Sequence, residues 1–323
     1  MMGRVTLETI REARGRLADA VYRTPMVRSR WMTPGGEPGA AGEAFFKLEC
    51  FQVTGSFKAR GAFAKMSALT PDEKRERVLT VSAGNHGLAV ANAAESLGLQ
   101  ATIVVPRSAS RAKVEAIRRY PVTLLELGES YDDAERAARQ LERETGWTFV
   151  SPYNDPEVIA GQGTVALEML EDHPQLDAIV VPVGGGGLIA GVTIAAKALN
   201  PRIKVYGAES VASPTMQRAL EAGRIIEITE DATIADGLAG NIEPGSITFP
   251  IIKELVDGII IVSEDAICSA MRRVAAEDHV MIEGSAAAGV AALEDTRLRG
   301  SRVAAIVTGR NITMEVFLHA VGK

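Results

Sequence analysis

The feature that most constrains the fold is a regular alternation of short apolar runs with helix-like segments. The runs are rich in β-branched and other apolar residues, which is typical of strands buried in a parallel sheet. Helical periodicity between the runs, for example at 87–97 and 188–198, indicates parallel βαβ units. We therefore expect an α/β fold with two parallel-rich α/β domains. The expected strands lie at 78–81, 101–105, 122–126, 179–183, 204–207, 258–262 and 303–307.

Chain length supports a division into two domains. The protein has 323 residues, and beyond roughly 250–300 residues a single hydrophobic core usually splits. We expect residues 51–150 to form a small α/β domain, inserted between 1–50 and 151–323, which together form a large one. A glycine- and proline-rich stretch at 33–42 predicts a loop within the large domain.

Charge and cysteine content narrow the class of partner. A net charge of −6 and a pI near 5.5 argue against binding nucleic acid, since that binding needs clustered cations. Cys50 and Cys268 are the only cysteines, which favours a reducing compartment. We found neither a signal-like N-terminus nor an apolar stretch of membrane-spanning length. We therefore expect a cytoplasmic protein with no nucleic-acid or membrane partner.

Four consecutive glycines, Gly184–Gly187, follow one of the apolar runs and precede a helix that begins near Leu188. Glycine lets backbone N–H groups curl around an anion, and the positive end of a helix adds to the attraction. The pattern predicts a phosphate site. Two other interpretations remain open, a dinucleotide loop lacking the usual glycine spacing and a structural glycine turn.

A second loop, Ser82–His86, also lies between a strand and a helix. Its hydroxyl and backbone amides are suited to a carboxylate, and Asn85 is placed to reach a phenolic oxygen. The alternative is an ordinary helix cap, with His86 at the surface.

Lys58 follows a Gly-Ser turn and an aromatic residue, Phe57, in a context typical of a reactive amine. Thr308 follows the last apolar run, at the sheet edge where ligands of open α/β folds bind. Considered alone, Lys58 could be an ordinary surface lysine and Thr308 part of an ordinary strand-to-helix turn. Together with the two loops they indicate pyridoxal phosphate, which needs an amine, a phosphate cradle and groups that orient its ring.

These segments together resemble the fold-type II pyridoxal phosphate enzymes, which have the tryptophan-synthase-β-like fold. Within that group the chain is similar to the serine/threonine dehydratase (threonine ammonia-lyase) and serine racemase family. Residues 155–164, 234–237 and 246–250 add to the resemblance.

The resemblance implies a role for each site residue. Lys58 would be the catalytic residue and the covalent attachment point of the cofactor, with Phe57 beside it. Asn85 would bind the ring oxygen and Thr308 would lie at the ring nitrogen. The remaining residues would bind the cofactor phosphate, as Gly184, Gly185, Gly186, Gly187 and Leu188, or line the substrate carboxylate, as Ser82, Ala83, Gly84 and His86.

Two departures from the family pattern affect the expected function. Serine racemases usually carry a second serine where this chain has Ala83, so racemisation is not expected. Glu209 resembles the first carboxylate of the family's divalent-metal site, but Thr215 stands where a second acid would follow. No metal site is therefore predicted.

We predict a dehydratase that converts L-threonine or L-serine to a 2-oxo acid and ammonia. One alternative is a related dehydratase with a specialised substrate, such as hydroxyaspartate or an amino acid from hydroxyectoine breakdown. Others are an amino-acid racemase, a β-replacement enzyme and a catalytically silent protein that binds the cofactor. The family also implies a homo-oligomer, a dimer or a tetramer.

Overall fold

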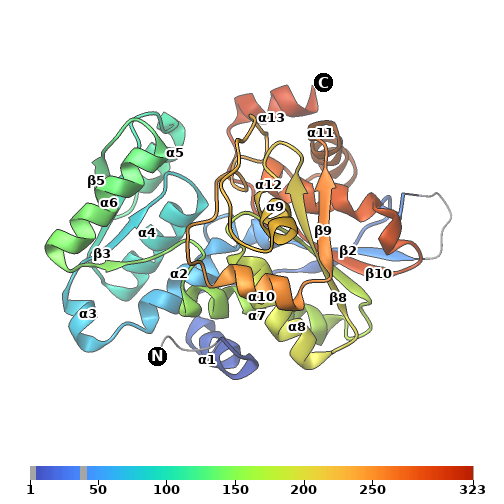
Figure 1. Ribbon diagram of the computed structural model, residues 1–323, viewed down its shortest axis with the longest axis horizontal. Helices are drawn as coiled ribbons and strands as arrows, with labels where there is room; N and C mark the ends of the chain where they lie inside the picture. Colours follow the sequence, from blue (N-terminus) through green and yellow to red (C-terminus); the bar gives the residue numbers. More distant parts are fainter. Residues whose placement is uncertain (1–4, 37–41, 323) are drawn as a thin grey trace.

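The computed structural model describes residues 5–36 and 42–322, which form two sheets covered by helices (Figure 1). Of the loop expected at 33–42, residues 37–41 lie outside the described ranges. The larger sheet has six strands, parallel except for the pair β1–β2. Its strand order is β1 (Met26–Arg28), β2 (Glu43–Lys47), β10 (Arg302–Ile306), β7 (Ala178–Pro182), β8 (Lys204–Ser210) and β9 (Gly258–Val262).

The smaller sheet has four strands, all parallel. The fold class is confirmed, because both sheets are parallel-rich and alternate with helices. The division of the chain at residues 51 and 150 stays a prediction, which the sequence separation of the two sheets supports. The order of the smaller sheet is β5 (Thr123–Glu126), β4 (Ala101–Val105), β3 (Val78–Val81) and β6 (Thr148–Phe149).

Helices surround both sheets, and α2 (Lys58–Ser67) lies between them, in contact with α4 and α7. In Figure 1 the smaller sheet and its helices occupy the left side and the larger sheet the right. Helices near the smaller sheet are α3 (Pro71–Arg75), α4 (Asn85–Leu97), α5 (Arg111–Arg118) and α6 (Tyr131–Thr145). The others are α1 (Leu7–Leu17), α7 (Pro156–Asp172), α8 (Gly187–Leu199), α9 (Thr215–Ala222), α10 (Thr248–Leu255), α11 (Glu264–Arg273), α12 (Gly284–Ala291) and α13 (Met314–Val321).

Helix α7 is the central packing element of the molecule. Asp155 caps it by accepting bonds from two backbone amides, and Pro156 occupies its first position, where a missing N–H costs nothing. Every residue from Val158 to Leu170 is buried, so this part of the helix is surrounded by protein on all sides. At Gly161 a Cβ would lie 2.6 Å from the carbonyl oxygen of Arg60, so glycine permits the close crossing of α7 and α2.

Short irregular helices complete the chain. Two follow α12, at Ala292–Glu294 and Thr296–Leu298, and another, Glu49–Phe51, follows β2. A π-helical turn, Val274–Asp278, extends α11 and ends at His279, which has a positive φ of 57°. No helix of the described ranges is both long and apolar enough to cross a membrane.

Candidate active site

Three of the predicted site segments follow the carboxyl ends of parallel strands. Ser82 follows β3, Gly184 lies two residues beyond β7, and Thr308 lies two residues beyond β10. Strands β7 and β10 are hydrogen-bonded neighbours in the larger sheet, whereas β3 belongs to the smaller one. Polar loops from both sheets therefore supply the site, as expected for open α/β folds.

Lys58 is the first residue of α2, and its side chain is half-buried. Its Nζ donates a hydrogen bond to the carbonyl oxygen of Pro152 at 2.8 Å and lies 5.2 Å from the ring centre of Phe57. Burial lowers the pKa of the Lys58 amine to about 8, although the carboxylate of Glu283 opposes that shift. The unprotonated fraction of this amine at neutral pH is therefore much larger than that of an ordinary lysine.

The turn that leads into Lys58 is hydrogen-bonded to the turn after β10. Ser56 and Gly309 form an antiparallel bridge, and the Phe57 amide donates to the Thr308 carbonyl at 3.0 Å. Gly55 has φ of +75°, a conformation that glycine adopts without strain. This pairing fixes Thr308 beside Lys58 along the backbone.

Asn85, Asn311 and Glu283 form a hydrogen-bonded triad next to that turn. The Asn85 amide nitrogen donates to Glu283 Oε1 at 2.8 Å, and Asn311 Nδ2 donates to Asn85 Oδ1 at 2.6 Å. The backbone amide of Asn311 donates to Glu283 Oε2 at 3.1 Å. One N–H of Asn85 is left over, because a primary amide carries two.

Glu283 is the main site residue that the sequence did not indicate. Its side chain is 6% exposed. Burial, reinforced by the charge of Asp236, raises the pKa of Glu283 to about 7, although the hydrogen bond from Asn85 opposes the shift. The residue follows no recognisable motif. Only its contacts with Asn85 and Asn311, both distant in sequence, identify it.

The glycine run forms a tight turn at the start of α8. Gly186 has φ of +86° and precedes the first helical residue. A Cβ on Gly185 would lie 2.3 Å from the ring of Tyr153, and one on Gly187 would lie 2.9 Å from the Tyr153 backbone. Backbone and aromatic ring can approach this closely because the side chains are absent, which leaves a backbone-lined cradle at a helix N-terminus.

Tyr153 connects this cradle to Lys58, since it directly follows Pro152, the hydrogen-bond partner of the Lys58 amine. Its hydroxyl accepts a bond from the Glu243 amide at 3.0 Å. The Lys58 turn, the Thr308 turn and the glycine cradle therefore form one continuous set of contacts.

The Ser82–His86 segment is partly helical, because α4 begins at Asn85 rather than near residue 87 as the sequence suggested. Ser82 Oγ accepts a bond from the Gly84 amide at 3.1 Å, and Ser82 to Asn85 are half-buried. Ala83 presents a methyl group that packs against apolar residues under α4.

His86 is buried, so the alternative surface position was wrong. Its Nε2 lies 2.9 Å from the carbonyl oxygen of Val150, which makes Nε2 the protonated nitrogen. Burial, together with the charge of Lys58, lowers the pKa of His86 to about 3, and the ring is neutral. A neutral ring at this position is a hydrogen-bonding group rather than a charged anchor.

Both carboxylate oxygens of Glu209 already have partners. They accept bonds from the backbone amides of Met216 and Gln217 at 2.7 and 2.9 Å, so this side chain caps α9. Thr215, with Ser213, donates instead to the carboxylate of Glu230. Within the described residues no group of three or more histidine, cysteine or acidic side chains has metal-binding geometry. The prediction about metal stays a prediction.

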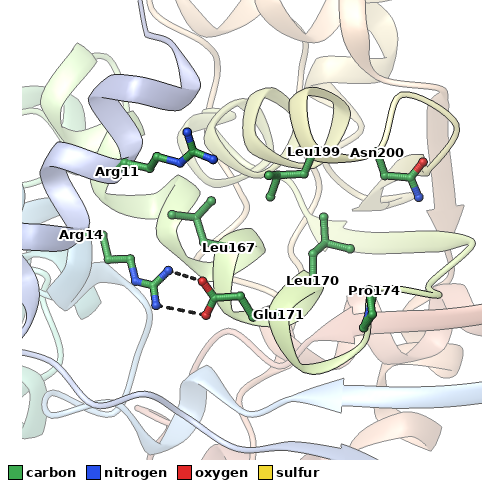
Figure 2. Close-up of a pocket in the computed structure, with 8 residues that line it drawn as sticks. All are labelled: Arg11, Arg14, Leu167, Leu170, Glu171, Pro174, Leu199 and Asn200. Atoms are coloured by element: carbon green, nitrogen blue, oxygen red, sulfur yellow. Dashed lines mark hydrogen bonds and ion pairs between the residues drawn. The ribbon is translucent and has the colours of Figure 1, made fainter.

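A hollow elsewhere on the molecule involves none of the predicted site residues. It has a volume of about 210 Å³ and lies between α1, α7 and α8 (Figure 2). The side chains of Leu167, Leu170 and Leu199 line it, and the ion pair between Arg14 and Glu171 lies at one side. The Glu171 carboxylate is already paired with two arginines, Arg14 and Arg23. We therefore interpret the hollow as a gap between packed helices and not as a ligand site.

The arrangement fits pyridoxal phosphate. The Thr308 hydroxyl is buried at 3% exposure and has no hydrogen-bond partner within residues 5–36 and 42–322. A buried hydroxyl without a partner is costly unless a ligand satisfies it. Lys58 supplies an amine with a lowered pKa, and Gly184–Gly187 supply an anion cradle. These groups suit the ring nitrogen, aldehyde and phosphate of the cofactor respectively.

Comparison with known proteins shows the family to which the chain belongs. The model of the family described as "Pyridoxal-phosphate dependent enzyme" matches residues 17–309. The chain belongs to this family. Pyridoxal phosphate is therefore its cofactor, and the protein is an enzyme of the fold-type II group.

Relatives within this pyridoxal phosphate family carry different names. The L-threonine ammonia-lyase of Thermotoga maritima is 40% identical over 320 residues, covering 99% of this chain and 79% of the relative. The "L-threonine dehydratase catabolic TdcB" of Escherichia coli K12 is 39% identical, covering 96% and 94%. Maize serine racemase has a TM-score of 0.90 with 37% identity, covering 98% and 97%. Overall identity thus does not separate the two activities.

Proposed function

We propose that this protein is a pyridoxal phosphate-dependent dehydratase that converts L-threonine or L-serine to a 2-oxo acid and ammonia. The observation that carries the proposal is the amine of Lys58, whose pKa burial lowers to about 8 and whose charge acts on His86 in the Ser82–His86 loop. The second position of that loop is Ala83. The names of the Thermotoga and E. coli relatives support the same reaction.

The cofactor, when bound, withdraws electrons from the Cα of the attached amino acid and so makes its proton removable. Lys58 would hold the cofactor and, once its amine is released, would accept that proton at Nζ. The backbone amides of Gly184–Gly187 and Leu188 would bind the phosphate. Asn85 would donate its remaining N–H to the ring oxygen, and the Thr308 hydroxyl would bind the ring nitrogen.

The environment of Lys58 suits a general base at neutral pH. A base is most effective when its pKa lies close to the working pH, and burial has moved this amine from its ordinary value of 10.5 to about 8. The hydrogen bond to the Pro152 carbonyl holds Nζ in one direction. The β-hydroxyl would then leave as water, taking up a proton returned from Lys58 Nζ. A second water would hydrolyse the released enamine to the 2-oxo acid and ammonia.

Substrate binding belongs to the start of α4. The substrate carboxylate would bind to Ser82, Gly84 and the adjacent backbone amides. The neutral ring of His86 would lie next to them. Ala83 has no ionisable or hydroxyl group with which to return a proton to the opposite face of Cα. This absence supports elimination over racemisation.

The direct test replaces Lys58. Lys58→Ala should abolish both the visible absorbance of the lysine-bound cofactor and the release of 2-oxo acid from threonine or serine. Lys65→Ala is the matched control, because Lys65 lies two turns along the same helix and pairs with Asp155 instead of facing the site. Retention of elimination by Lys58→Ala would remove the basis of the proposal.

A specialised substrate is the second candidate. Hydroxyaspartate, or an amino acid from hydroxyectoine breakdown, would use the same chemistry. Tyr153 lies against the glycine cradle, and with Arg310 it is a position at which this chain would alter the pocket. A panel of β-hydroxy amino acids assayed for 2-oxo acid and ammonia ranks these substrates. Release from none of them would favour the catalytically silent or β-replacement alternatives.

Assembly and location stay predictions. We propose a homo-oligomer, a dimer or a tetramer, working in the cytoplasm. Light scattering coupled to size-exclusion chromatography tests the first, and fractionation of the source cells tests the second.

A further inference from the structure

Four ionisable side chains form a buried group behind α2. Lys47 and Glu49 are fully buried, Arg60 is 1% exposed and Glu168 is 7% exposed. Two carry positive charge and two carry negative charge, so the group is neutral overall. They come from β2, the short helix after it, α2 and α7. We call these four residues the charge cluster.

Arg60 joins the members of the charge cluster through its guanidinium. Its Nε and Nη2 donate to the Glu49 carboxylate at 2.8 and 2.7 Å, and its Nη1 and Nη2 donate to Glu168 at 2.7 and 2.9 Å. The Lys47 ammonium donates to the same Glu168 carboxylate at 2.6 Å. One planar group is therefore held in a fixed plane by two carboxylates.

Lys58 and Arg60 point to different sides of α2. The two residues are separated by two positions, which corresponds to about 200° around a helix of 3.6 residues per turn. The Lys58 amine accordingly reaches the Pro152 carbonyl, whereas Arg60 reaches Glu49 and Glu168. Fixing Arg60 on one side of the helix fixes the direction of Lys58 on the other.

The charge cluster is also linked to the turn that carries Thr308. The Lys47 carbonyl accepts a bond from the Val307 amide at 2.9 Å, and the Cys50 amide donates to the Val307 carbonyl at 2.8 Å. Val307, the residue before Thr308, is thus anchored through its amide to β2 and through its carbonyl to the short helix after β2.

Stability alone does not account for such a cluster. Replacing a buried ion pair by well-packed apolar residues is often neutral or stabilising, because desolvation cancels much of the attraction. Apolar packing, however, is non-directional, whereas a forked guanidinium between two carboxylates sets both rotation and register. The Lys58 side chain, at the first position of α2, requires a fixed direction if its amine is to reach the cofactor.

We propose that Arg60, held by the charge cluster, is a positioning residue that aims Lys58 at the cofactor. This inference rests on the proposed role of Lys58. It concerns only the direction of the Lys58 amine, and it is independent of which amino acid is the substrate.

The test is Arg60→Lys, which keeps the positive charge but loses the fork. Cofactor-free protein is mixed with pyridoxal phosphate, and the rate of covalent attachment is followed by absorbance, with Lys58→Ala as zero. We expect attachment and kcat each to fall about tenfold or more, while KM changes little, because small misplacements of a reacting group are costly. Attachment of the cofactor is measured without substrate. The attachment rate therefore tests the role of Arg60 even if the proposed substrate is wrong.

Lys197→Met is the matched control for lost stability. Lys197 pairs with Asp257 at 2.6 Å on the far part of α8, and both side chains are largely buried. We expect it to lower the melting temperature while leaving attachment to Lys58 unchanged. Equal losses of attachment rate in Lys197→Met and Arg60→Lys would overturn the inference, as would a wild-type attachment rate in Arg60→Lys.

Glu168→Gln carries the same test if Arg60→Lys does not fold. The substitution preserves shape but weakens one of the two carboxylate contacts of Arg60. A slower attachment rate than that of the wild type supports the inference. A wild-type rate of attachment together with wild-type kcat contradicts it.

Discussion

At Lys58 two opposing influences act on one amine. Burial disfavours the charged form and lowers the pKa, whereas the nearby carboxylate of Glu283 favours the charged form and raises it. Burial is the larger influence, and the pKa falls to about 8. The effect of Glu283 on the Lys58 amine changes with pH, since the pKa of Glu283 itself lies near 7.

The first prediction is a titration of this amine. In cofactor-free protein, the rate of Lys58 modification by trinitrobenzenesulfonate should rise with an apparent midpoint near pH 8, well below the ordinary lysine value of 10.5. Glu283→Gln removes a negative charge and should move the midpoint to lower pH. Peptide mass analysis assigns the modification to Lys58. An unchanged or higher midpoint in Glu283→Gln would show that the carboxylate does not act on the amine.

At the scale of single elements, the glycine turn before α8 depends on the absence of side chains. Gly185→Ala places a methyl group where the Tyr153 ring lies, 2.3 Å from the nearest ring atom. Because the ring must move, the cradle changes shape, and we expect the Kd for pyridoxal phosphate to rise about tenfold or more, which equals about 1.4 kcal/mol. Fluorescence or absorbance titration measures this Kd.

Gly15→Ala is the control for that experiment. Gly15 lies within α1 with nothing within 4 Å of the added methyl group. Alanine favours the helix over glycine by roughly 0.5–1 kcal/mol, so the variant should be as stable as the wild type or more so, with an unchanged Kd. A Kd in Gly185→Ala equal to that of Gly15→Ala would exclude the glycine turn from phosphate binding.

Elements with a local pattern could be predicted from the sequence, and elements that depend on distant contacts could not. The apolar runs became β3, β7 and β10, and the loops after them reached the site because parallel strands end at one edge. Helix α7 was missed, since it is buried on all sides from Val158 to Leu170 and lacks the exposed polar face that gives helical periodicity.

The same limit applies within the site. Lys58 and Gly184–Gly187 have recognisable local contexts. Glu283, in contrast, follows a π-helical turn and the positive φ of His279, and it meets Asn85 from 198 positions away. That pairing comes from the tertiary fold, and no spacing in the sequence encodes it.

At the scale of the whole molecule, the site joins both sheets, and its ionisation affects global stability. Glu283 has a folded pKa of about 7, raised from 4.5. Because the pKa is raised, its stabilising contribution is complete below pH 4.5 and is lost as the pH rises through about 7. The full difference corresponds to roughly 3 kcal/mol of unfolding free energy, as an order of magnitude.

Glu283→Gln cannot ionise, so it should escape this loss. Relative to the wild type, we expect the cofactor-free variant to gain unfolding free energy between pH 5 and pH 8, because the wild type must bury a charge at the higher pH. Urea unfolding at the two pH values measures the difference, and the comparison cancels groups common to both proteins. A relative stability that is independent of pH would contradict the raised pKa.

The most direct test of the proposed reaction is a product analysis. Purified protein loaded with pyridoxal phosphate is incubated with L-threonine and L-serine, and 2-oxo acid, ammonia and D-amino acid are quantified together. We predict equal amounts of 2-oxo acid and ammonia with no D-isomer, and no product from Lys58→Ala. D-Serine as the main product would contradict a dehydratase, as would the absence of 2-oxo acid from both substrates.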